Sequence, residues 1–248
     1  VESTYGEINV TNNGDITATA SIGNDQGYGV AEAIGIYNYS YLYDSSVVNN
    51  GTVSAAVSAG GTYDSTPYTD GCIGDCNQIS AIGVAVIDYV GYYSSASLEN
   101  GVDGVISATA TVHTGIAQAY GALVVAGTAN AYFYGSAEIT NDGSISASAS
   151  GQYAGLNATG ARAFAVNGDA SIVNNGDISA TVRIDEAGFG VSTGVDATAL
   201  GLGIDFGMYT YNSAEVINHG DISATTSIDR GYAYATGVVT QYTKYSSV

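Results

Sequence analysis

The sequence predicts an all-β protein, a single parallel β-helix (β-solenoid) of about six long, irregular coils that spans residues 1–248. Three observations predict this fold. A short motif recurs six times, residues alternate with period two after each copy, and a second motif follows at a preserved distance. Self-similarity of this kind is the sequence signature of a repeat architecture, in which stacked units bury one continuous core.

The repeated motif reads apolar-x-Asn-x-Gly-x-Ile/Val-Ser/Thr-Ala. Five copies are VTNNGDITA (10–18), VVNNGTVSA (47–55), EITNDGSISA (138–147), IVNNGDISA (172–180) and VINHGDISA (216–224), and a sixth with a longer turn is LENGVDGVISA (98–108). Each copy supplies one apolar core anchor: Ile16, Val53, Ile106, Ile145, Ile178 and Ile222. Successive anchors lie 33–53 residues apart, which favours a solenoid with variable loops over a rigid propeller blade.

Each Asn-x-Gly step predicts a sharp turn, because Asn and Gly both tolerate positive φ. Stacked coils would align the motif asparagines into a column whose amides hydrogen-bond along the stack. The members of this expected column are Asn12, Asn49, Asn100, Asn141, Asn174 and Asn218. The alternative is that each Asn-Gly is a hairpin turn, which would need a partner strand immediately upstream.

The residues after each anchor alternate between small apolar and hydroxyl side chains, as in Ile145, Ala147 and Ala149 against Ser146, Ser148 and Ser150. This period predicts strands with a narrow, alanine-lined interior. An Ala-x-Gly motif follows in most repeats, and in the fifth either Ser192–Gly194 or Ala199–Gly201 fills its place. The shortest repeat predicts three strands per coil, at Ser144–Ala149, Ala158–Val166 and Ala170–Asn174.

The charge balance limits the partners. Lys and Arg total 4 against 23 Asp and Glu, for a net charge of −19. Nucleic acid is excluded as a partner because binding phosphates needs basic residues. The Ser/Thr and Ala faces are poorly lipophilic, so we expect a chain that is not embedded in a membrane. Val1 is expected to mark a processed or excerpted start, since no Met or signal peptide opens the sequence.

An insertion at about 60–78 interrupts the second repeat and carries both cysteines. We expect a disulfide between Cys72 and Cys76, consistent with an oxidising extracellular setting. A calcium site at Asp64, Asp70 and Asp75 is a second interpretation of this loop. Zinc is disfavoured because neither histidine is nearby in sequence, and apart from calcium we expect no cofactor.

Tyrosines gather late in several repeats and predict an aromatic ladder between coils. Its expected members are Tyr39, Tyr41, Tyr92, Tyr132, Tyr134, Tyr209 and Tyr211. The alternative is an exposed aromatic surface that contacts glycans, neighbouring fibres or abiotic surfaces.

No catalytic residues are assigned, and we expect a protein that is not an enzyme. Solenoid hydrolases and lyases need carboxylates with Arg or Lys on one face. The four cations are Arg162, Arg183, Arg230 and Lys244, and none has such a pattern around it in sequence.

The motif pattern, as in IVNNGDISA followed by a later ATG, resembles the repeats of bacterial autotransporter-type passenger domains and related β-solenoid surface adhesins. This resemblance covers nearly the whole chain and implies a right-handed parallel β-helix at the bacterial cell surface. We therefore expect an extracellular structural protein with an adhesive or biofilm-matrix role.

Neither terminus carries a recognisable cap, so we expect end-to-end stacking into a homopolymer. One alternative is a segment of a long monomeric autotransporter adhesin. Another is an ice-binding solenoid, suggested by the outward Ser/Thr residues.

Overall fold

The computed structural model describes residues 1–4, 6–23, 29–60, 77–89, 93–127, 134–202 and 213–245. Every regular element in this part of the chain is a β-strand. The strands are β1 (Glu2–Ser3), β2 (Ile8–Asn12), β3 (Asp15–Ile22), β4 (Val30–Ser40), β5 (Ser45–Asn49), β6 (Thr52–Ala59), β7 (Asn77–Asp88), β8 (Tyr93–Asn100), β9 (Val105–Ala126), β10 (Tyr134–Asn141), β11 (Ser144–Val166), β12 (Ala170–Asn174), β13 (Asp177–Leu202), β14 (Ala214–Asn218) and β15 (Asp221–Tyr245).

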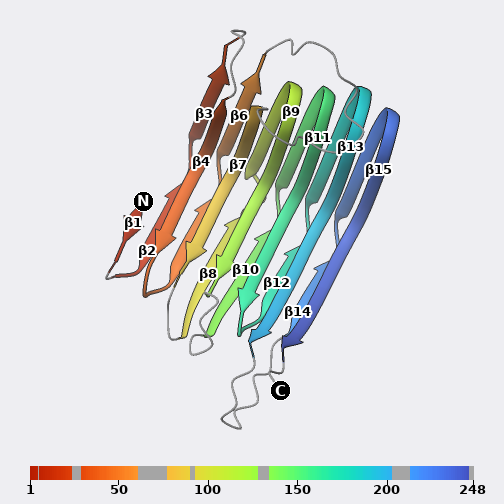
Figure 1. Cartoon of the computed structure of the whole chain (residues 1–248). Coiled ribbons are helices and arrows are strands. Elements are labelled where there is room, and N and C mark those ends of the chain that lie inside the picture. The colour runs from red at the N-terminus through yellow and green to blue at the C-terminus, as the bar shows by residue number, and fades with distance from the viewer. Residues whose placement is uncertain are drawn as a thin grey trace.

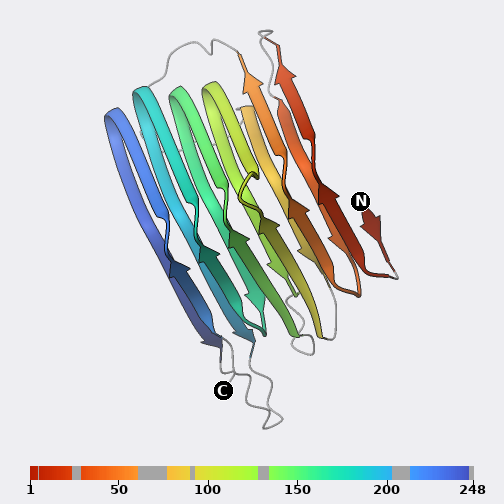
Figure 2. The same ribbon diagram turned by 180° about the vertical axis from the view of Figure 1, so that it is seen from behind.

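The strands form two parallel sheets that run through the whole stack of repeats. The shorter strands make a six-stranded sheet in the order β14-β12-β10-β8-β5-β2. The longer strands make a nine-stranded sheet along β1-β4-β7-β9-β11-β13-β15, and β3 joins it through β6, which pairs with β9. Figures 1 and 2 show the repeats side by side in sequence order, from red to blue. All pairs are parallel, which is incompatible with hairpins at the Asn-x-Gly turns.

The strand registers align the repeats residue by residue. Ile145, for example, pairs with Ile106 on one side and Ile178 on the other. The four inner anchors are almost fully buried, whereas Ile16 and Ile222 in the two outer repeats are partly buried. Fully burying an Ile side chain contributes roughly 1.5–3 kcal/mol, so the anchor column is a main source of stability.

The interior has a wide and a narrow part. The wide part lies against the six-stranded sheet and holds large side chains such as Leu98, Ile139 and Ile172. The narrow part lies between the two arms of the long strands and is lined mostly by alanines, including Ala108, Ala147 and Ala180. Small side chains there allow the two arms to approach each other closely.

The predicted strand boundaries are wrong in one respect. The segments expected as Ser144–Ala149 and Ala158–Val166 run together as β11, and only β12 is separate as expected. A register shift between Gly151 and Tyr153 marks the bend of β11, where the strand turns back without losing its neighbours. A bulge of this kind bends a strand while the pairing continues on either side.

In the part of the chain that the structure describes, no helix is long and apolar enough to cross a membrane.

Candidate functional site

The two end faces of the stack carry the strand edges that have no neighbouring repeat. We call the outer edges of β2, β3 and β4 the N-terminal end face, and the outer edges of β14 and β15 the C-terminal end face. Within the described residues, β14 and β15 each pair with one strand only, as do β2 and β3. Such edges present rows of backbone N–H and C=O groups that can template pairing with another chain.

The six motif asparagines form one column that runs from one end face to the other. Each side-chain Nδ2 donates to the Oδ1 of the asparagine in the next repeat, at 2.7–2.8 Å. The same amides also donate to the carbonyl of the motif glycine, as Asn141 does to Gly143 and, across its longer turn, Asn100 does to Gly104. The column therefore closes the turns and links all six repeats with a single direction of donation.

Because donation runs in one direction, the asparagine column ends with a donor at the C-terminal end face and with an acceptor at the N-terminal end face. At the C-terminal end face Asn218 accepts from Asn174 and donates to the carbonyl of Gly220, and among the described groups its amide has no asparagine beyond it to donate to. At the N-terminal end face the Oδ1 of Asn12 accepts only the Gly14 N–H among the described groups. A carbonyl oxygen has two lone pairs, so Asn12 can accept a second hydrogen bond from an asparagine beyond it.

The Ala-x-Gly glycines form a second column that faces the anchors across the interior. A Cβ built on Gly160 would lie 2.5 Å from Ile178 Cγ2 and 2.6 Å from the Gly194 oxygen, both in the next repeat. Gly35, Gly83, Gly121 and Gly194 meet the anchor of the following repeat in the same way. The glycine is needed because the next repeat occupies the space of a side chain.

This column decides which segment fills the motif's place in the fifth repeat. Ser192 pairs with Ala158, and Gly194 stacks on Gly160, so the motif is Ser192–Gly194. The Ser192 hydroxyl is buried and lies 2.8 Å from Thr226 Oγ1. A buried hydroxyl in an alanine column is thus satisfied by a second hydroxyl from the next repeat.

Two glycines at the end faces lack such a neighbour. Among the described residues, no atom lies within 4 Å of a Cβ built on Gly237 or on Gly14. Gly237 continues the column of Gly194. Gly14 occupies the same motif position as Gly51, and a Cβ added to Gly51 would collide with the Gly14 backbone. No contact with a described residue requires glycine at either end position.

We call the part of each long strand before the bend its first arm and the part after the bend its second arm. The outward side of the first arm carries an array of hydroxyl side chains. One column consists of Thr17, Ser54, Ser107, Ser146, Ser179 and Ser223, paired in register across all six repeats. A second column starts at Thr19 and is interrupted by Ala56. The sequence predicted both columns from the alternation alone.

A groove of about 700 Å³ lies beside the bend of the long strands. Gly155 occupies one outer column between Ile116 and Phe189, and the nearest atom to a Cβ there would be 3.9 Å away. A side chain would therefore fit, and the glycine keeps the hollow open. Tyr153 and Tyr232 form exposed aromatic walls.

The polar groups of this groove are few. Gln118 and Asn157 are neighbours across β9 and β11 and contribute side-chain amides, and Arg230 forms an exposed ion pair with Glu186 at 3.4 Å. An apolar concavity with a few fixed polar groups is the usual form of a small-ligand site. Sequence reasoning missed it, because its residues come from four different repeats.

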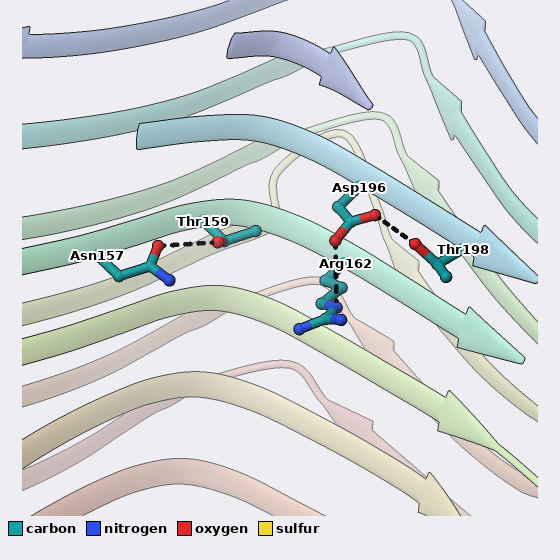
Figure 3. Close-up of polar contacts among 5 residues, drawn as sticks. All are labelled: Asn157, Thr159, Arg162, Asp196 and Thr198. Atoms are coloured by element: carbon teal, nitrogen blue, oxygen red, sulfur yellow. Dashed lines mark hydrogen bonds and ion pairs between the residues drawn. The ribbon is translucent and has the colours of Figure 1, made fainter. Parts of the chain in front are cut away.

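A polar cluster lies on the outward side of the second arm (Figure 3). Arg162 Nε is 3.3 Å from Asp196 Oδ2, and Asp196 Oδ1 accepts a hydrogen bond from Thr198 at 2.7 Å. The Arg162 guanidinium also lies 5.7 Å from the centre of the Phe164 ring. Asp196 lies in the next repeat, 34 positions further along the chain, so the residues around Arg162 in sequence do not indicate this partner. One carboxylate and one guanidinium do not by themselves supply a general acid and a general base.

Four of the described tyrosines gather in one place at the N-terminal end of the stack. Tyr37, Tyr39, Tyr41 and Tyr89 make a cluster with ring centres 6.0–6.2 Å apart. The column through Tyr39 continues as Ile87, Val125 and Phe164, and Tyr134 lies in the other sheet. Aromatic contact between coils is therefore present where Tyr39 and Tyr41 meet Tyr89, and a ladder through the other members stays a prediction. Tyr92, Tyr132, Tyr209 and Tyr211 lie outside the described residues.

Burial raises the pKa of the Tyr37 and Tyr39 phenols above their ordinary value, and nearby Glu2 adds to the effect. Because the neutral form is favoured in the folded state, this contribution to stability is complete below about pH 10 and is lost as the pH rises through the raised pKa values.

The inserted loop lies outside the described residues. This applies to the disulfide expected between Cys72 and Cys76 and to the calcium site expected at Asp64, Asp70 and Asp75. Within the described ranges, no group of three or more His, Cys, Asp or Glu side chains lies close enough together to hold a metal ion.

Comparison of the chain with protein-family models, with curated proteins and with solved structures finds no match.

Proposed function

We propose that this protein is the subunit of an extracellular filament, built by head-to-tail stacking of right-handed β-solenoids with six coils each. The observation that carries the proposal is the pair of end glycines. Gly14 and Gly237 are needed only where a further repeat covers the end face, because their counterparts inside the stack are needed for that reason.

The two end faces carry matching apolar columns. In the interior column of the short strands, Val216 of one copy would continue onto Val10 of the next. In the anchor column, Ile222 would continue onto Ile16, and both are only partly buried in the single chain. Stacking would bury these apolar groups and pair the edges of β14 and β15 with those of β2 and β3.

The asparagine column gives the contact its direction. Asn218 supplies the N–H and Asn12 the acceptor, so the C-terminal end face of one copy fits the N-terminal end face of another. Such a heterologous contact does not close on itself and produces a filament.

Handedness and coil number rest on general rules and on resemblance. Connections between parallel strands of one sheet are right-handed in about 98% of cases. Six sequence repeats and a six-stranded short sheet support six coils. The motif's likeness to autotransporter-type passengers and surface adhesins supports a location at the bacterial cell surface.

The filament would have an adhesive or matrix role through the groove at the bend. Its aromatic walls at Tyr153 and Phe189 and its amides at Gln118 and Asn157 suit the faces and hydroxyls of a neutral glycan. Stacking would repeat this groove along the filament, and many weak sites would then act together.

The direct test is assembly of the purified chain, followed by electron microscopy and sedimentation over a wide concentration range. We expect filaments from the wild type and none from Gly237→Ala, whose added Cβ would meet the next copy. The variant monomer should unfold at the wild-type denaturant concentration, because its Cβ meets nothing in the single chain.

Gly14→Ala is the matched variant on the other end face, and it should block assembly in the same way. A wild type that stays monomeric at every concentration would contradict the filament and favour the alternative, a segment of a long monomeric adhesin.

An ice-binding solenoid is the second candidate, favoured by the in-register hydroxyl column from Thr17 to Ser223. The measurement is thermal hysteresis of the monomeric Gly237→Ala variant. Hysteresis that disappears on placing a lysine at Ser146 would support ice binding, and its absence at millimolar protein would exclude it.

A further inference from the structure

The short strand β1 occupies the same edge that a stacked copy must use. It pairs in parallel with the end of β4, with Glu2 opposite Tyr39 and Ser3 opposite Ser40. The Tyr39 N–H donates to the Val1 carbonyl at 2.9 Å, and the Tyr41 N–H donates to the Ser3 carbonyl at 3.0 Å. Figure 2 shows β1 at the red edge of the stack, beside the N-terminal end face.

The strand registers identify which residue belongs at this place in a stack. Read from repeat to repeat, the Tyr39 column runs through Ile87, Val125, Phe164, Thr198 and Gln241. In a head-to-tail contact, Gln241 of the preceding copy would lie opposite Tyr39. Glu2 already lies there, and two strands cannot pair with the same edge.

We propose that β1 is an exchangeable strand, which covers the end of β4 in the free subunit and is displaced by the Val239–Thr243 segment of a second copy. This inference rests on the proposed filament. After the exchange, the Tyr39 and Tyr41 N–H groups would donate to the Thr240 and Tyr242 carbonyls of that copy, because these residues flank Gln241 as Val1 and Ser3 flank Glu2.

The pairing of β1 suits a temporary cover. Among the described residues, β1 pairs with the end of β4 alone, through Glu2 and Ser3. A short strand can leave its edge at little cost, whereas the incoming strand also pairs with the rest of β4. In the free subunit the cover shields part of an exposed edge from unrelated strands. Displacement of β1 would then be a step that slows the joining of subunits.

Two variants test the exchange through the kinetics of assembly. Residues 1–3 are also held by the Val1 amino group, which donates to the Tyr37 carbonyl at 2.6 Å. Removing residues 1–3 should shorten the lag before filaments appear by roughly tenfold or more, the effect of losing these three hydrogen bonds. Glu2→Ala is the matched control, since it keeps all three hydrogen bonds and should assemble like the wild type.

The second variant ties β1 to β4 through Ser3→Cys and Ser40→Cys. Neighbouring strands lie about 4.8 Å apart, within the Cα separations of about 4.4–6.8 Å that disulfides span. The oxidised variant should form no filaments, and a thiol reductant should restore them. The single Ser3→Cys variant and the wild type, each with and without reductant, control for Cys72 and Cys76.

The outcomes separate this inference from the proposed function. Filaments formed by the fully oxidised variant at the wild-type rate would overturn the strand exchange and leave the filament intact. A wild type that never assembles would overturn both.

Discussion

Gly160→Ala should destabilise the protein by about 3 kcal/mol or more, a large effect for a single methyl group. The added Cβ would lie 2.5 Å from Ile178 Cγ2, 2.6 Å from the Gly194 oxygen and 3.1 Å from the Ser179 oxygen. Two of these contacts are backbone atoms held by paired strands on both sides, so they cannot move away. Urea unfolding followed by circular dichroism measures the loss.

The matched control is Gly155→Ala in the same strand. Its Cβ would point outward, with its nearest contact at 3.9 Å, and glycine in a strand interior is itself unfavourable. We expect this variant to be as stable as the wild type or slightly more stable. Equal unfolding midpoints for Gly160→Ala and Gly155→Ala would show that the repeats are not packed against each other through the glycine column.

Asn141→Ala should cost about 3–5 kcal/mol. Asn141 is fully buried, accepts from Asn100 at 2.8 Å and donates to Asn174 at 2.7 Å. Removing it leaves a donor and an acceptor of these neighbours without partners in the interior, and each such group costs about 1–3 kcal/mol. The free energy of unfolding from denaturant titration measures the effect.

Asn175→Ala is the control for an amide outside the buried column. It tests whether the loss of stability in Asn141→Ala comes from burial in the column or from removing any asparagine amide. Asn175 is adjacent to the column and donates to Asp142 at 2.7 Å, but it is exposed. We expect its removal to change stability by less than about 0.5 kcal/mol. A loss equal to that of Asn141→Ala would contradict a special role for the buried column.

The sequence determined the parts of this protein that repeat. The Asn-x-Gly motif located the asparagine column, and the period-two alternation identified the inward Ile145 and the outward Ser146. These features are readable because parallel stacking places equivalent residues opposite each other, so the buried anchor column and the asparagine column each keep one kind of side chain. Deviations from the repeat carried less information, as the ambiguous fifth Ala-x-Gly motif shows.

Only the tertiary structure decided how one repeat meets the next. The partnership of Arg162 with Asp196, the fit of Gly160 against Ile178 and the groove at Gly155 all join residues from different repeats. Because the loops differ in length, the sequence separation between such partners changes from repeat to repeat, and no fixed spacing identifies them. The bend of β11 was equally hidden, since a bulge changes the course of a strand without changing its alternating composition on either side. The position of β1 on β4 depends on an open edge, and an edge exists only once the repeats have stacked.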